Sequence, residues 1–227
     1  MKITKVKLYA YDLHKMKEFY SDHLGFTLIK NTDNYFEIAV GESIITFEKI
    51  PAFVNKQYHF ALNIPCNLFQ QAKSWVKEHT EILCSDGQDE VYFEILMAHS
   101  CYFYDAEENI IEFISRQEVN QKQDAEYFSP EHVLSIGEMN LTTDTIYSVA
   151  NSLKEYGITP MKNSEISVDG LTFIGNYEDG ANLLLGPSKR IWYFSDKKAI
   201  VSPIMIEIDK HLQLNMNEMG DFTVTQL

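Results

Sequence analysis

The stretch 102-YFYDAEENIIEFISR-116 decides the fold, because its second half recurs in two weaker copies that each end a similar block. The three copies are SIITF at 43–47, NIIEF at 109–113 and NLLLG at 182–186. In the middle copy a carboxylate, Glu112, interrupts an apolar strand, where the other copies carry Thr46 and Leu185. A charge inside an apolar strand needs a compensating partner, so Glu112 is the first candidate for a functional side chain.

Composition indicates an ordinary globular protein. The 227 residues are 45% hydrophobic and 13% aromatic, which suffices for a packed core. An excess of 33 acidic over 19 basic residues argues against nucleic acid and against an anionic membrane surface as partners. Three cysteines without metal-type spacing, and no apolar run of membrane length, predict reduced thiols and a cytoplasmic location.

Hydrophobic periodicity divides the chain into repeated blocks of one strand, one helix and further strands. In the first block Asp12 is placed to cap a helix and Gly25 to end it. The expected strands are 5–11, 26–30, 35–40, 43–49, 58–64, 92–96, 99–104, 110–115, 134–142, 171–176, 182–185, 190–194 and 202–208. Residues 216–227 have little pattern, so we expect them to be loosely held.

Two motifs in this repeat, YDLHKMKEFYSDHLGF at 11–26 and CYFYDAEENIIEF at 101–113, resemble the vicinal oxygen chelate superfamily. That superfamily includes glyoxalases, extradiol dioxygenases, fosfomycin-modifying transferases and bleomycin-binding proteins. The resemblance implies an α+β fold in which tandem strand-helix-three-strand modules form a half-open β cup with helices on its convex side. We expect a complete two-module domain at 1–117, a linker at 118–130, and a divergent third module with extra strands at 131–227.

Strand alternation indicates which side chains face the helices and which face the cup. The helix-facing set is Val6, Leu8, Phe60, Leu62, Ile111 and Phe113. The set expected to line the cup is Lys5, Lys7, Tyr9, Thr46, His59, Asn63 and Glu112.

The resemblance also implies a metal position, because enzymes of this superfamily hold a divalent ion with residues from the first and last strands of their modules. His59 and Glu112 match two such positions, whereas Lys5 stands where a histidine is expected, and an ammonium has no lone pair for a metal. The expected cofactor is therefore none or one weakly bound divalent metal. Glu112 is alternatively expected to pair with Lys5, which would satisfy the buried charge without a metal.

The third module offers two further cup-lining candidates. Glu138 lies near the corresponding position of its first strand, and Trp192 lies in an aromatic run beside Arg190. The alternative interpretation of Glu138 is an exposed strand residue, and that of Trp192 is a residue packed in the core.

Three functions remain open from the sequence. The favoured one is a small-molecule-binding protein of the glyoxalase, bleomycin-resistance and dioxygenase type, with a polar cup and an incomplete metal site. The alternative is an enzyme, a divalent-metal-dependent lyase or a ring-cleaving dioxygenase acting on vicinal oxygens. A scaffold that retains only the fold is the third. The expected partner is a small molecule, and a homodimer is one way to cover the apolar face of the third module.

Overall fold

The first module follows from local signals. In the computed structural model, which describes residues 1–227, the Asp12 carboxylate accepts a hydrogen bond from the Lys15 amide at 3.1 Å and so caps the helix, as predicted. Gly25 follows the helical segment with a φ of 77°, a conformation that glycine adopts without strain. The elements are β1 (Ile3–Ala10), α1 (Leu13–Lys17) with a π-helical continuation (Glu18–His23), β2 (Leu28–Asn31), β3 (Tyr35–Val40) and β4 (Ser43–Lys49).

The second module repeats this order and ends in the stretch 102–116. One difference from expectation is a 3-10 turn at Glu94–Leu96, followed by Met97 at a φ of 45°, which shortens the expected strand at 92–96. The elements are β5 (His59–Asn63), α2 (Phe69–His79), β6 (Val91–Phe93), β7 (Ala98–Tyr104) and β8 (Ile110–Arg116).

The third module is followed by a three-stranded meander, which stands where a fourth module would be. Residues 190–194 form no strand, against expectation. Residues 204–208 and 212–216 form a hairpin whose turn has positive φ at Asp209 and Lys210. The poorly patterned residues 216–227, expected to be loosely held, supply a third strand that pairs with 212–216. The sequence did not predict the hairpin at 204–216, because its turn lacks glycine. The elements are β9 (Ser135–Thr142), α3 (Ile146–Glu155), β10 (Thr172–Ile174), β11 (Asn182–Gly186), β12 (Ile204–Ile208), β13 (Leu212–Met216) and β14 (Phe222–Gln226).

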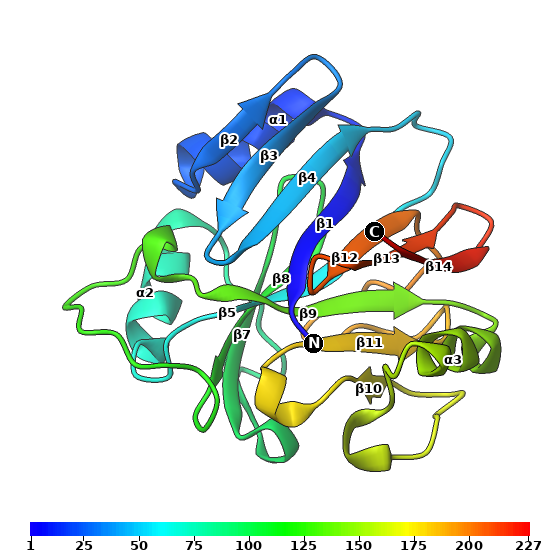
Figure 1. Ribbon diagram of the computed structural model, residues 1–227. Helices are drawn as coiled ribbons and strands as arrows, with labels where there is room; N and C mark the ends of the chain where they lie inside the picture. The colour runs from blue at the N-terminus through cyan, green and yellow to red at the C-terminus, as the bar shows by residue number, and fades with distance from the viewer.

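The modules assemble into one open sheet of fourteen strands (Figure 1), which confirms the predicted α+β class. The pairing of modules differs from expectation, since β1 does not pair with β5. Instead β5 pairs with β9 of the third module, and β1 pairs with β12 of the meander. The third module therefore completes its sheet within the chain, and two half-sheets, β4-β1-β12 and β8-β5-β9-β11, meet where Ile3 pairs with Ile136.

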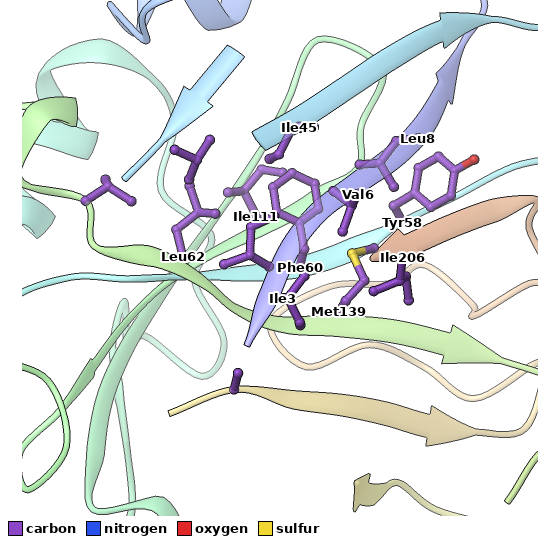
Figure 2. Packing of buried hydrophobic residues seen from close by; sticks show 14 of the residues in the cluster. Ile3, Val6, Leu8, Ile45, Tyr58, Phe60, Leu62, Ile111, Met139 and Ile206 are labelled. Atoms are coloured by element: carbon purple, nitrogen blue, oxygen red, sulfur yellow. The ribbon is translucent and has the colours of Figure 1, made fainter. Parts of the chain in front are cut away.

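A single apolar core joins these half-sheets. Figure 2 shows side chains of β1, β4, β5, β8, β9 and β12 converging between them, including Val6, Phe60 and Ile111. The helix-facing set predicted from strand alternation lies in this core: Val6, Leu8, Phe60, Leu62, Ile111 and Phe113. None of the helices has the length and apolar character needed to cross a bilayer.

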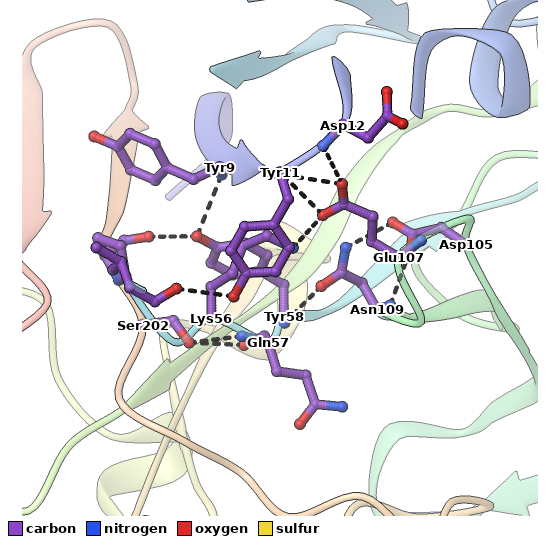
Figure 3. A network of polar contacts seen from close by, with 12 residues as sticks. Tyr9, Tyr11, Asp12, Lys56, Gln57, Tyr58, Asp105, Glu107, Asn109 and Ser202 are labelled. Carbon is purple, nitrogen blue, oxygen red and sulfur yellow. Dashed lines mark hydrogen bonds and ion pairs between the residues drawn. The ribbon is translucent and has the colours of Figure 1, made fainter. Parts of the chain in front are cut away.

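A buried polar network fastens the start of α1 to the second module (Figure 3). The Glu107 carboxylate accepts hydrogen bonds from the amides of Tyr11 and Asp12 and forms an ion pair with Lys56 at 2.6 Å. The Lys56 and Glu107 side chains are 1% and 8% exposed, so little solvent screens the pair. This contact fixes the first module against the turn that precedes β8, the strand that carries Glu112.

Candidate functional site

Glu112 lies on β8 with its side chain turned away from the helices, as alternation requires. Its residue is 1% exposed, and its strand neighbours are Ala61 on β5 and Tyr102 on β7. The Oε1 atom of Glu112 is buried and has no hydrogen-bond partner. A buried carboxylate oxygen without a partner is costly, which indicates that a cation or a donor belongs beside it.

Glu138 reaches the same place from the other side of β5. Ala61 on β5 is paired with Glu112 on β8 and, on its other side, with Glu138 on β9. The two carboxyl groups therefore flank one small residue. The methyl group of Ala61 leaves the space above the strand free for both side chains. Glu138 is 3% exposed, which excludes its interpretation as an exposed strand residue.

His59 completes the group from the beginning of β5. Its Nδ1 atom lies 3.1 Å from the carbonyl oxygen of Ile110, an arrangement that requires Nδ1 to be the donor. In the neutral ring Nε2 then carries a lone pair, and this atom lies 3.5 Å from Oε2 of Glu112. Two acceptors that face each other call for a proton or a metal ion between them.

An arginine from the same strand as Glu112 stabilises the second carboxylate. Arg116 donates to Glu138 Oε1 at 2.7 Å and to Asn63 Oδ1 at 2.5 Å, and both charged side chains are almost fully buried. Burial and the charge of Glu112 raise the pKa of Glu138 to about 8, although Arg116 acts in the opposite direction. Glu138 is therefore close to its titration point at neutral pH.

The three side chains fit a divalent metal. His59, Glu112 and Glu138 each present one ligand atom, and these atoms lie within 4.8 Å of one another. One imidazole and two carboxylates suit first-row ions such as manganese, iron and zinc. The unpartnered Glu112 oxygen and the hydrogen bond that fixes the His59 ring match the way metal ligands are oriented in proteins.

A cavity of about 280 Å³ opens onto these ligand atoms. It lies among strands of the second and third modules and the segment after β11, which supplies Arg190, Trp192 and Tyr193. The Trp192 ring lies against the His59 ring with 4.7 Å between centroids. The apolar part of the wall consists of Phe93, Ile95, Leu96, Ile110, Leu171, Phe173 and Leu184.

Five residues expected in this cup lie elsewhere. Lys5 forms an ion pair with Glu37 at 2.6 Å, and Lys7 forms one with Glu48 at 3.3 Å, both within the first module. Thr46 also donates to Glu37. Lys5 therefore does not pair with Glu112, and the expectation of a shared cup fails because β1 joins β12 instead of β5.

The remaining expected residues of that module and the next are also outside the cavity wall. Tyr9 contributes its backbone amide to the Tyr58 hydroxyl, and Asn63 lies behind the site, where it accepts from Arg116 and lines a separate polar groove of about 750 Å³. Of the predicted residues, the cavity wall contains His59, Glu112, Glu138 and Trp192.

Two site residues escaped sequence inspection. Arg116 shares the strand face of Glu112, since the two residues are four apart in β8, and this spacing was the available signal. Tyr102 lies directly across from Glu112 on β7, and burial together with the charges of Glu112 and Glu138 raises the pKa of its hydroxyl well above 10. Only the strand pairing reveals the position of Tyr102.

Comparison with protein families gives one partial match. A family model described as toxoflavin-degrading enzyme matches residues 136–190, which include Glu138 and Arg190. No curated protein sequence matches the chain.

Solved structures with glyoxalase and dioxygenase descriptions have a similar fold. A glyoxalase I variant from Zea mays aligns with 99% of this chain and 93% of its own, at a TM-score of 0.59 and 9% identity. Glyoxalase I from the same organism has a TM-score of 0.57 and 10% identity, and the alignment covers 99% of this chain and 92% of that chain. A structure described as a putative dioxygenase from Bacillus subtilis has a TM-score of 0.57 and 16% identity, and the alignment covers 82% of this chain and 63% of that chain.

Proposed function

Because the chain has the fold of the vicinal oxygen chelate superfamily, we propose that it is a divalent-metal-dependent enzyme of the glyoxalase or dioxygenase type. The proposed substrate is a small molecule with two adjacent oxygens, and the proposed metal ligands are His59, Glu112 and Glu138.

The observation that carries this proposal is the convergence of three buried ligand atoms within 4.8 Å in the wall of a mainly apolar cavity. Glu138 supplies the third ligand that the first module lacks. Buried carboxylates this close repel each other unless a cation lies nearby, and Arg116 contacts only one of them.

The chain's own residues have separable roles. When bound, the metal would polarise substrate oxygens and stabilise negative charge that develops on them. His59 is oriented by its hydrogen bond to Ile110, and Arg116 holds Glu138 in place. The mainly apolar wall of the cavity limits the access of bulk water to these groups.

One contact favours a second candidate function, a metal-free binding protein. The 2.7 Å ion pair of Arg116 with Glu138 already supplies one positive charge to the site. If Glu138 or His59 also holds a proton, the group is neutral without a metal. The protein would then bind its small molecule in the same cavity and leave it unchanged.

Metal analysis separates these two functions. Protein purified without chelator is analysed for manganese, iron, zinc and nickel, and apo protein is titrated with each ion by calorimetry. Near-stoichiometric binding that Glu112→Gln and Glu138→Gln each weaken by about tenfold or more supports the enzyme.

Lys5→His and the exposed Glu131→Gln are the matched controls, and both should retain wild-type metal binding. Lys5 is the position that family spacing assigns to a ligand, so a variant Lys5→His that gains metal when wild type binds none would contradict the assignment of Glu138. Absence of binding for all four ions would favour the binding protein.

A further inference from the structure

Arg190 is a charged side chain in the cavity wall without an acidic partner. Its Nε and Nη2 atoms are buried and make no hydrogen bond, and only Nη1 donates, to the carbonyl oxygen of Ile191 at 3.0 Å. Arginine stays protonated in proteins, so these two buried donors bring positive charge to a mainly apolar cavity wall. Buried charged donors left unpaired are destabilising, and a protein retains them where a ligand satisfies them.

The position of Arg190 is fixed by its surroundings. The guanidinium lies over the Trp192 ring at 4.0 Å, and the backbone carbonyl of Arg190 accepts from the Ala199 amide at 2.7 Å. The Trp192 amide in turn donates to the Lys197 carbonyl at 3.0 Å. The donors are therefore held in place before any ligand arrives, which lowers the entropic cost of binding.

No carboxylate of the protein is near enough to serve as the partner. Burial alone lowers the pKa of Arg190, without a contribution from a neighbouring acid. Glu138 already accepts from Arg116, and Glu112 faces His59. Positive charge at Arg190 and negative charge at the two glutamates thus lie at separate places in one cavity wall.

The cavity restricts what fits between them. Its volume of about 280 Å³ is just below the usual range for ligand pockets, and ten of its fourteen lining residues are hydrophobic. A compact, apolar body with polar groups only at its ends matches this wall.

We propose that Arg190 binds an anionic group, a carboxylate or a comparable oxyanion, of a small apolar ligand whose other end carries the oxygens directed at His59, Glu112 and Glu138. The position of those oxygens rests on the proposed function, whereas the pairing of Arg190 with the anion does not. A bidentate contact between guanidinium and carboxylate would satisfy the two buried donors.

The test compares ligands that differ in one charge. Calorimetry of metal-loaded protein measures binding of 3,4-dihydroxybenzoate and of catechol, which lacks the carboxylate. We expect the carboxylate to improve affinity by about tenfold or more, as for hydrogen bonds to a charged group. Arg190→Met should abolish this preference and leave catechol binding within about twofold of wild type.

Two variants control for folding and for general charge. Lys198→Met removes an exposed cation from the same segment and should keep the preference. Arg190→Met should unfold at the same temperature as wild type or higher without ligand, because it removes a half-buried charge that no acidic side chain pairs. Three results would overturn the inference. In wild type they are equal affinity for the two probes, or failure of both probes to bind at millimolar concentration. In Arg190→Met it is an equal loss of affinity for both probes.

A second pair of probes makes failure of this inference distinguishable from failure of the proposed function. Benzoate and benzyl alcohol have no adjacent oxygens, so their relative affinity for apo protein reports Arg190 alone. A benzoate preference that Arg190→Met removes sustains the inference even if no metal binds. Metal binding with no benzoate preference in wild type overturns the inference and leaves the metal site intact.

Discussion

Glu112 on β8 and Glu138 on β9 lie on opposite sides of the same β5 residue, Ala61, and both are almost fully buried. Arg116 donates a hydrogen bond to Glu138, whereas Glu112 keeps a buried oxygen without a partner.

The first prediction concerns stability without metal. The pKa of Glu138 rises from 4.5 to about 8 on folding, so between these values the folded state holds a proton that the unfolded state has lost. The stabilisation is complete below pH 4.5 and is lost as pH rises through about 8. The free energy of unfolding, measured with urea, should decrease from pH 5 to pH 8 in wild type. This decrease should exceed the decrease in Glu138→Gln by at least about 1 kcal/mol. Identical decreases in both proteins would argue against the raised pKa.

The second prediction concerns metal binding. A metal ion needs Glu138 ionised, so its binding should release a proton at pH 6 to 7, where apo Glu138 is largely protonated. Affinity should increase with pH until about 8 and then level off. Calorimetry in buffers of different ionisation enthalpy counts the protons, and Glu138→Gln should release fewer. A pH-independent affinity would contradict this assignment.

The third prediction concerns the buried pair of Lys56 and Glu107. Lys56→Met leaves the Glu107 carboxylate buried without its cation and should lower the free energy of unfolding by about 3 kcal/mol. Chemical denaturation measures this loss. Lys2→Met is the control, because its pair with Glu42 is exposed and should change stability by less than about 1 kcal/mol.

The fourth prediction concerns the three thiols. Cys84 is exposed, Cys66 is half-buried and Cys101 is buried, and burial raises the pKa of the Cys101 thiol. A colourimetric disulfide reagent should label Cys84 first in native protein, and Cys101 only after denaturation. The Cys84→Ser variant should lose the fast phase, and fast labelling of Cys101 would show that its strand opens readily.

The sequence by itself determined which way side chains point. Strand alternation is a local property of the backbone, so it assigned Val6, Phe60 and Ile111 to the core and turned His59 and Glu112 away from it. The interruption of an apolar strand marked Glu112 without any knowledge of its neighbours. The helix cap at Asp12 was equally local.

Only the tertiary structure decided which strands lie side by side. Any strand edge offers the same backbone donors and acceptors, so the repeat could not tell whether β5 pairs with β1 or with β9. Pairing with β9 brings Glu138 to Glu112 and leaves Lys5 with Glu37. A site built from three strands and a distant segment depends on contacts between residues far apart in the chain, and those contacts are set by how the whole core packs.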